Sequence, residues 1–362
     1  MRRTELPPHK TATYVLPRWK LVYVSVPKAA CTSLKWLLAD LQGERRERFH
    51  ATLSTETGRN MTVHRRARWQ DTPMLHELSD GDLEQISPDN GWFVFAVVRH
   101  PSARLWSGWQ SKLLLREPRF AKLYPEAPWP RMPASTSDVV EEFHRFVRAL
   151  DEEPEQPIFG DRHFLRQAEL LRIDRMPYSR IYPTSQIPQL LDDLEKHLLP
   201  QGLDRMPELS RNNETPLRPI AAVFSSEISQ IIGRHYASDF ERFGYTDPVP
   251  HALAPGDAYT AQELAEVGRL AERSERVGDL VEMATRWRSR QRTLTRQVAA
   301  LHRQVADLED QVAALEGRAP TIAEMRPFAR RLLSGARRRT VRTLRDLKAR
   351  GRAATVRAEP PR

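Results

Sequence analysis

A lysine and two hydroxyl residues follow an apolar run near the start of the chain, a combination that can hold a phosphate group. Residues Leu21–Val26 are rich in β-branched and aromatic side chains, which predicts a buried strand that ends at Pro27. Thr32 or Ser33 can then cap a helix. The start of a helix exposes unpaired backbone N–H groups and the positive end of its dipole, and Lys28 adds a full positive charge beside them. This segment therefore predicts an anion-binding loop.

The same arrangement recurs after a second predicted strand. Phe93–Val98 is a continuous apolar run, as expected of a parallel strand covered on both faces, and Arg99 follows it where ligands of open α/β sheets usually bind. Arg99 can grip a phosphate with a forked pair of donors, and Ser107 can add a hydroxyl from the helix that we expect after Pro101. Arg104 either serves the same helix face or is solvated. Two such loops suit a ligand that is phosphorylated at both ends.

The first loop differs from the loop that binds Mg-ATP. An ATP-binding loop reads G-x-x-x-x-G-K-[ST], with glycines for close backbone approach and a hydroxyl on magnesium, whereas residues 27–35 contain no glycine. A nucleotide kinase would also need magnesium ligands and a Walker-type acid, which the sequence does not show. No metal-ligand spacing is present either. We therefore expect a metal-independent reaction.

Four segments, in order along the chain, resemble motifs of carbohydrate sulfotransferases of the chondroitin and HNK-1 type, sulfotransferase family 2. They are Pro27–Lys35 (P-K-x-A-C-T-x-x-K), Arg99–Ser107 (R-x-P-x-x-R-L-x-S), Asp161–Phe164 (D-x-H-W) and Tyr236–Tyr245 (Y-x-x-D-F-x-x-F-G-Y). The first two match at every fixed position, and in the third a phenylalanine stands where the family has tryptophan. The resemblance covers roughly Pro17 to Tyr245 and identifies the chain as a bacterial-type member of the family.

The resemblance implies an α/β fold with a P-loop-like parallel sheet and flanking helices. It also implies transfer of a sulfuryl group from 3'-phosphoadenosine 5'-phosphosulfate to a hydroxyl of a glycan or glycolipid. Carried over position by position, the residues that hold the 5'-phosphosulfate are Lys28, Ala30, Cys31, Thr32 and Ser33, and those that hold the 3'-phosphate are Arg99 and Ser107. Lys28 would also stabilise the leaving group, because such transfer relies on positioning and electrostatics.

The acceptor hydroxyl needs a base, and His76 is our first choice. The resembling family places a histidine ahead of its R-x-P segment, and histidine has the pKa range for this role. The neighbouring Glu77 is the runner-up, since some glycan sulfotransferases use a carboxylate. The other histidines considered are His50, His64 and His163. We interpret His163 either as a wall of the donor or acceptor site or as a packed structural residue.

A polar and basic stretch lies between the two phosphate-binding segments. Residues His50–Arg68 have few periodic apolar positions, so we expect an irregular excursion that could contact the acceptor. Arg65, Arg66 and Arg68 could meet acidic sugars there, although a charge run is more often a solvated surface.

Length and composition allow one large α/β domain with an appendage. The 362 residues have ordinary apolar content and one cysteine, Cys31, which excludes an internal disulfide. No stretch of 18 apolar residues is present, and the first residues lack an apolar signal region. We therefore expect a cytoplasmic protein, in contrast to the Golgi members of the resembling family, which carry a membrane anchor and paired cysteines.

The character of the chain changes after the last motif. We expect an N-terminal extension (1–16), a sulfotransferase domain (17–246), a linker and charged helix without globular pattern (247–276), a coiled coil (277–317) and a basic tail (318–362). In the coiled coil valine occupies one seam position (Val298, Val305, Val312) and leucine the other (Leu294, Leu301, Leu308, Leu315). This combination favours a parallel two-stranded coil, so we expect a homodimer.

The tail concentrates positive charge. Residues 318–362 carry fourteen Lys and Arg residues against three acids, while the whole chain has a net charge of +10. Interspersed leucines and valines give a basic amphipathic pattern that fits either an anionic membrane surface, such as the inner face of a cell membrane, or a disordered solubilising tail. No motif specific for nucleic acid is present. The alternative to an enzyme is a non-catalytic dimeric scaffold with a degenerate binding domain.

Overall fold

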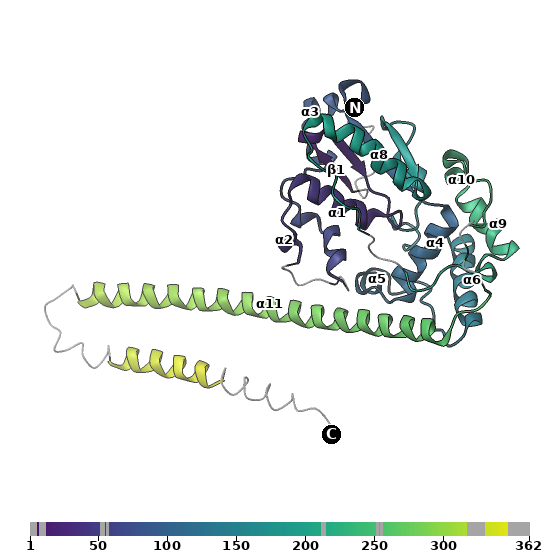
Figure 1. Ribbon diagram of the computed structural model, residues 1–362. Helices are drawn as coiled ribbons and strands as arrows, with labels where there is room; N and C mark the ends of the chain where they lie inside the picture. The colour runs from purple at the N-terminus through teal and green to yellow at the C-terminus, as the bar shows by residue number, and fades with distance from the viewer. Residues whose placement is uncertain are drawn as a thin grey trace. The chain divides into compact units, whose positions relative to one another are not determined.

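The computed structural model of the chain is shown in Figure 1. It describes residues 6, 12–50, 55, 58–210, 215–250, 253, 256–316 and 330–346. The chain divides into two compact units, Met1–Ala284 and Thr285–Arg362, and each is described by itself.

The described part of the first unit contains a four-stranded sheet in the order β1-β2-β3-β4. The strands are β1 Thr13–Leu16, β2 Leu21–Val24, β3 Phe93–Val98 and β4 Arg180–Pro183. β2, β3 and β4 pair in parallel, which confirms the expected parallel arrangement for these three strands. β1 pairs antiparallel with β2 and forms one edge, although its residues were assigned to an N-terminal extension. Three of its four residues are apolar or aromatic, and the fourth is Thr13. A run of four residues is too short to predict a strand from the sequence alone.

Helices flank this sheet and form the rest of the first unit. Their bounds are α1 Cys31–Gln42, α2 Arg46–His50, α3 Asp80–Gln85, α4 Pro101–Trp109, α5 Pro118–Leu123, α6 Thr136–Glu152, α7 Gln167–Leu171, α8 Ile187–Leu198, α9 Ser226–His235, α10 Ala237–Phe243 and α11 Ala261–Glu316. A π-helix, Gln110–Leu114 (η7), continues α4 directly. The predicted α/β class is therefore confirmed.

Two apolar clusters form the core of the first unit. One surrounds the sheet and includes buried residues of α1 and α8. The other is helical, with residues of α4, α6 and α9. At its centre the Trp106 ring lies 5.2 Å from that of Trp109 and 4.9 Å from that of Phe143, in stacked and edge-on contacts typical of aromatic cores. α4 begins at the end of β3 and enters the helical cluster, so it connects the two parts.

The first turns of α11 belong to the first unit and pack against the rest of it. Val267, Ala271 and Ser274 are buried, and Tyr259 just before the helix donates its hydroxyl hydrogen to the Arg218 carbonyl oxygen at 2.8 Å. The sequence suggested a charged helix without globular pattern here. The buried residues lie four and three positions apart on one face, but two of them are small, so the stripe was not recognised as a core face.

The second unit consists of the rest of α11 and a helix over residues 330–346. The seam residues of α11 are exposed, from 38% for Val312 to 63% for Leu315. Within the described ranges, none of the helices combines the length and apolar character needed to span a bilayer. A long helix is therefore present where the coiled coil was predicted, and its pairing with a second copy stays a prediction.

A buried arginine joins the two clusters. Arg104 on α4 is 1% exposed, and its guanidinium donates to the carbonyl oxygens of Pro27 at 3.0 Å, Leu165 at 2.8 Å and Arg162 at 2.8 Å. The expectation that Arg104 is solvated or serves the ligand face is wrong. Three carbonyl groups converge on its position, and a fixed planar fork of donors satisfies all of them.

Replacing Arg104 by methionine should destabilise the first unit. Three buried carbonyl groups would lose their donor, at about 1–3 kcal/mol each when left unsatisfied, so we expect a loss of roughly 3–5 kcal/mol in the free energy of unfolding. Urea unfolding followed by circular dichroism measures this loss. Arg175→Met, at an exposed position, is the control. A loss below about 1 kcal/mol for Arg104→Met would contradict the structural role.

The predicted dimer can be tested at the exposed seam. Replacing Leu301 and Leu308 by lysine places charges in the seam of a two-stranded coil, so the full-length protein should change from dimer to monomer in multi-angle light scattering. Gln304→Lys with Asp307→Lys adds charge outside the seam and should leave the dimer intact. A monomeric wild-type chain, or a dimer that survives the leucine replacements, would show that this seam does not pair.

The direction of pairing has a separate test. Between residues 286 and 310 the arginines come first (Arg286, Arg288, Arg290, Arg292, Arg296, Arg303) and the acids last (Asp307, Glu309, Asp310). A parallel pair brings like charges together, which the Val and Leu seam must outweigh. A Leu294→Cys variant should form a disulfide-linked dimer if the helices are parallel. An antiparallel pair would place residue 294 near residue 312 of the second copy and give no such link.

Candidate active site

The first predicted phosphate loop turns without glycine. Between β2 and α1, Lys28 and Ala30 adopt left-handed backbone conformations, with φ of 69° and 54°. Such conformations cost a non-glycine residue on the order of 1 kcal/mol each, and they cluster at functional sites. The helix begins at Cys31 with Ala30 as its N-cap, and no side chain caps it. The predicted capping by Thr32 or Ser33 is therefore wrong, because the turn itself starts the helix and leaves the Thr32 hydroxyl available for another partner.

That partner is His64, which forms a chain of hydrogen bonds with two residues of α1. Its Nδ1 atom lies 2.9 Å from the Lys35 ammonium nitrogen and its Nε2 atom 2.9 Å from the Thr32 hydroxyl oxygen. Because an ammonium only donates, Nδ1 accepts and Nε2–H donates to Thr32, whose own hydrogen is donated to the Met61 Sδ atom at 4.0 Å. Burial, reinforced by the charge of Lys35, holds the pKa of His64 well below its usual value, so the ring is neutral.

The second loop is held against the first. The Arg99 backbone N–H donates to Gln167 Oε1 at 2.9 Å, and Gln167 Nε2 donates back to the Arg99 carbonyl oxygen at 2.8 Å. Asp239 in turn accepts from the Gln167 backbone N–H at 2.8 Å. The Arg99 guanidinium reaches the Lys28 carbonyl oxygen at 3.4 Å. Two loops far apart in sequence therefore meet at the ends of β2 and β3.

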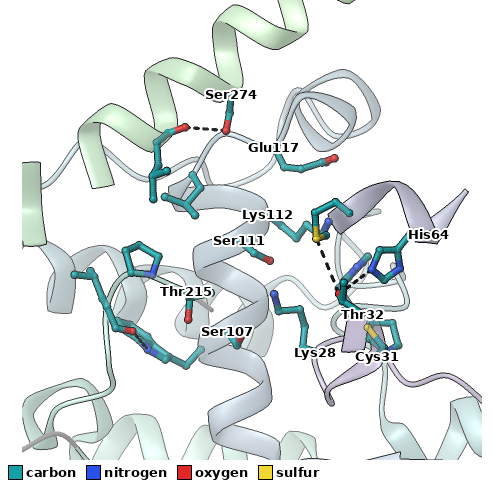
Figure 2. A pocket seen from close by; sticks show the side chains of 18 of the residues that line it. Lys28, Cys31, Thr32, His64, Ser107, Ser111, Lys112, Glu117, Thr215 and Ser274 are labelled. Atoms are coloured by element: carbon teal, nitrogen blue, oxygen red, sulfur yellow. Dashed lines mark hydrogen bonds between the residues drawn. The ribbon is translucent and has the colours of Figure 1, made fainter. Parts of the chain in front are cut away.

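The predicted phosphate-binding residues open onto one cavity of about 1050 Å³. Its lining includes Lys28, Ala30, Cys31, Thr32, Arg99 and Ser107, so six of the seven predicted binding residues gather there. Ser33 is buried but does not line it. Figure 2 shows Lys28 and Ser107 on facing sides of this space, with Ser111 and Lys112 further along the same wall.

The electrostatics of this cavity favour an anion. Burial lowers the pKa of Lys28 to about 7, and the charges of Lys112 and Arg99 act in the same direction. Burial also lowers the pKa of Arg99. Within the part of the chain that the structure describes, no cluster of acids, histidines and cysteines could hold a metal ion. A bound phosphate would relieve the repulsion among these cations and restore the charge on Lys28.

A second cavity of about 1180 Å³ adjoins the first. The two share seven lining residues, Thr55, Met61, His64, Lys112, Glu117, Arg162 and His163. His76, the predicted base, lines only the second cavity, together with Glu77. Glu77 pairs with Arg66 and accepts the Met74 backbone N–H at 2.8 Å. Although burial opposes it, the Arg66 hydrogen bond keeps the pKa of Glu77 below its usual value, which makes this carboxylate a weak base. His50 lies outside both cavities and packs near the Trp36 ring.

His163 lies where the two cavities meet and is paired with an acid. Its Nδ1 atom is 2.6 Å from Asp161 Oδ1, which also accepts the His163 backbone N–H at 2.9 Å. Tyr124 donates to the other oxygen of Asp161 at 3.1 Å. Burial raises the pKa of Asp161, but the His163 and Tyr124 hydrogen bonds outweigh it and hold this pKa low. Burial and Lys112 lower the pKa of His163 well below its usual value, against the pull of Asp161.

The Asp161–His163 pair fixes one tautomer. Nδ1–H donates to the carboxylate, so the lone pair is on Nε2, which has no hydrogen-bond partner among the described residues. This arrangement is that of a histidine oriented to accept a proton. Sequence reasoning left open whether His163 was a wall residue or a packed structural one, and the structure places it on the wall of both cavities.

Several lining residues were not found from the sequence. Ser111 and Lys112 lie on the π-helix, and Glu263, Glu266 and Ser274 come from the first turns of α11. The loop at Thr215–Pro219 also lines this cavity. Two hydrogen bonds hold the loop in place: Gln110 Oε1 accepts the Leu217 N–H at 3.1 Å, and Gln110 Nε2 donates to the Leu217 carbonyl oxygen at 2.9 Å. Residues 211–214, which precede this loop, lie outside the described residues. No motif marks these positions.

Comparison with known proteins agrees with the geometry. The family model described as "Sulfotransferase family" matches residues 11–246, which include both phosphate loops, Arg104 and the Asp161–His163 pair. No curated protein and no solved structure gives a significant match. The matched range spans more than half of the chain. The chain therefore belongs to sulfotransferase family 2.

Proposed function

We propose that this protein transfers the sulfuryl group of 3'-phosphoadenosine 5'-phosphosulfate to a hydroxyl group of a glycan or glycolipid. One observation carries the proposal: Lys28 and Arg99, at the ends of separate strands, line one cavity, and the Arg99 guanidinium lies 3.4 Å from the Lys28 carbonyl oxygen. A donor phosphorylated at both the 3' and the 5' positions needs two such cradles. The cavity of about 1050 Å³ is large enough for a nucleotide.

The residues at each loop suit one end of the donor. Lys28, Thr32 and the backbone N–H groups at Ala30–Ser33 would hold the 5'-phosphosulfate at the start of α1. Arg99 and Ser107 would hold the 3'-phosphate, since the guanidinium fork and a hydroxyl match phosphate oxygens. The Lys35–His64–Thr32 chain fixes the position of the Thr32 hydroxyl, and Thr32 lines this cavity. A scaffold without activity is less well supported, because all of these groups gather at one site.

The chemistry follows from this placement. The acceptor oxygen forms a bond to sulfur while the bond between sulfur and the bridging oxygen of the 5'-phosphate breaks. Lys28 stabilises the negative charge that develops on that leaving oxygen, and the neighbouring N–H groups share it. The proton of the acceptor hydroxyl passes to a base. Positioning and fixed positive charge supply the catalysis, so the residues present can perform the step without a metal.

The geometry favours His163 over His76 as that base. His163 borders both cavities, and its Nε2 lone pair is oriented by Asp161. His64 is engaged through both ring nitrogens, which suits positioning of Thr32. His76 lines only the cavity away from Lys28. We therefore assign His163 the proton transfer and Asp161 the orientation of its ring, with His76 as the alternative from the sequence.

Binding of 3',5'-adenosine bisphosphate tests the donor site. Titration calorimetry should show binding that is unchanged by a chelator and weaker for Arg99→Ala. Because the pKa of Lys28 is about 7 in the free protein, this side chain loses its charge between pH 7 and pH 9, and the affinity should fall about tenfold or more. Lys28→Ala should bind weakly at both pH values and lose this pH dependence. Its turnover should be abolished.

The exposed Lys122→Ala is the matched control and should bind like the wild type. A requirement for a divalent metal, or tighter binding of ATP than of the bisphosphate, would overturn the proposed mechanism.

Turnover of histidine variants tests the base. His163→Ala should lower kcat by about 100-fold or more, the usual contribution of a general base, with the bisphosphate affinity changed less than twofold. Since burial depresses the pKa of His163, the wild-type kcat at saturating donor should stay nearly constant as the pH falls from 7 to 6. The assay uses labelled donor with an acceptor found by screening, and His50→Ala is the control. A loss confined to His76→Ala would show that His76 is the base.

A further inference from the structure

The described part of the basic tail is a helix with two different faces. It covers residues 330–346, is drawn in yellow in Figure 1, and is called the tail helix below. Because successive residues of a helix are turned by about 100°, six of its side chains fall within about one third of the circumference. These six are Leu332, Leu333, Ala336, Thr340, Thr343 and Leu344. The tail helix therefore has one mainly apolar face.

The two threonines do not interrupt this face. Thr340 Oγ1 donates to the Ala336 carbonyl oxygen at 2.9 Å, and Thr343 Oγ1 donates to the Arg339 carbonyl oxygen at 2.9 Å. Because each hydroxyl hydrogen is already bonded within the helix, removing it from water leaves no donor without a partner. The whole face can therefore enter an apolar environment.

The rest of the circumference is positively charged. The tail helix contains seven arginines and one acid, Asp346. Five of the arginines lie on the side away from the apolar face, at positions 331, 338, 339, 342 and 345. Arg330 and Arg337 border the apolar face, where a long side chain can lay its stem along apolar surface and keep its guanidinium in water. Apolar and cationic groups are thus separated around one short helix.

A second copy of the chain is a poor match for this face. Leu332, Leu333 and Leu344 are 63%, 58% and 59% exposed, so the face has no cover among the described residues. In a paired coil, the seven-residue repeat that contains both Leu333 and Leu344 would place Arg330 and Arg337 in the seam. Like charges would then meet between the two helices. The repeat that pairs residues 294–315 is therefore not continued in the tail helix.

A lipid surface uses both faces at once. Nucleic acid would attract the arginines but leave the leucines in water, whereas a bilayer interface offers acyl chains to the leucines and headgroup anions to the arginines. At 1.5 Å per residue the tail helix extends about 25 Å, less than the roughly 30 Å of a hydrocarbon core. Together with the seven arginines, this length favours a helix that lies along the surface.

We infer that the tail helix binds the surface of an anionic lipid bilayer and lies in the plane of that surface. Its leucines enter the boundary between headgroups and acyl chains, and its guanidinium groups bind headgroup phosphates through paired N–H donors. The inference uses no residue of either cavity, so it stands or falls independently of the proposed function.

Vesicle binding tests this inference. Full-length protein is co-sedimented with vesicles of phosphatidylcholine alone and with vesicles that also contain phosphatidylglycerol at about 30 mol %. Binding to the anionic vesicles should be about tenfold or more tighter, because each arginine near an anionic surface adds to the attraction. This preference should shrink as the salt concentration rises from about 50 to about 500 mM.

Two double variants separate the apolar and the charged contributions. Leu333→Gln with Leu344→Gln keeps every charge and should weaken binding to the anionic vesicles about tenfold or more, because apolar burial is lost. Arg338→Gln with Arg342→Gln keeps the leucines and should weaken the same binding about tenfold, with binding to the neutral vesicles unchanged. Circular dichroism checks that each variant is folded.

Matched controls lie at exposed positions of the first unit. Arg45→Gln with Arg175→Gln removes the same number of charges as the arginine variant, and Leu199→Gln removes an exposed leucine. Both controls should bind the anionic vesicles within twofold of the wild type.

Several results would overturn the inference. They are the absence of vesicle binding, equal binding to neutral and anionic vesicles, and binding that survives the loss of both leucines. A short DNA duplex that binds more tightly than the anionic vesicles, and that is released only in the arginine variant, would assign the tail helix to nucleic acid. The leucine variant should keep the wild-type mass in multi-angle light scattering, and a smaller mass would assign this face to a second copy.

Discussion

The site depends on the buried guanidinium of Arg104. This one side chain donates to carbonyl groups of the first phosphate loop, at Pro27, and of the segment that carries His163, at Arg162 and Leu165. Its own backbone belongs to α4, which starts at Pro101, two residues after Arg99. Because a buried charge without partners is strongly disfavoured, the three segments are held to one arrangement. Elements distant in sequence therefore present donor-binding groups and a base to the same space.

Positive charges are concentrated in the site that Arg104 holds together, and their mutual repulsion is unfavourable. Burial lowers the pKa of Lys28 to about 7, and the charges of Lys112 and Arg99 act in the same direction. Strained backbone at Lys28 and Ala30 adds a further cost. Interactions that destabilise the empty site become favourable when an anion occupies it. The apolar clusters and hydrogen bonds elsewhere in the first unit must therefore supply the stability that the site lacks.

Motif spacing predicted the centre of the site but not its walls. Lys28, Thr32, Arg99 and Ser107 come together as expected, because a cation after an apolar run marks a strand end and parallel strand ends meet at one edge. β3 has the predicted bounds for the same reason. The pairing of Asp161 with His163 was not predicted, since a two-residue spacing becomes a hydrogen bond only through the local turn. Contributions from Lys112 and α11 depend on tertiary packing, which leaves no local pattern.

The position of Lys112, the cation between the two cavities, depends on the π-helix Gln110–Leu114. A regular α-helix advances each residue by about 100°, and a wider turn accommodates one extra residue before the register resumes. Upstream of this turn, Trp106 and Trp109 are buried in the helical core, whereas Ser111 and Lys112 within it line the cavity. Deleting a single residue there would close the wide turn into a regular α-helical turn and shift the residues within it by roughly one position, about 100° around the helix axis. The ammonium group would then leave the passage between the cavities, although no tryptophan of the core had been touched.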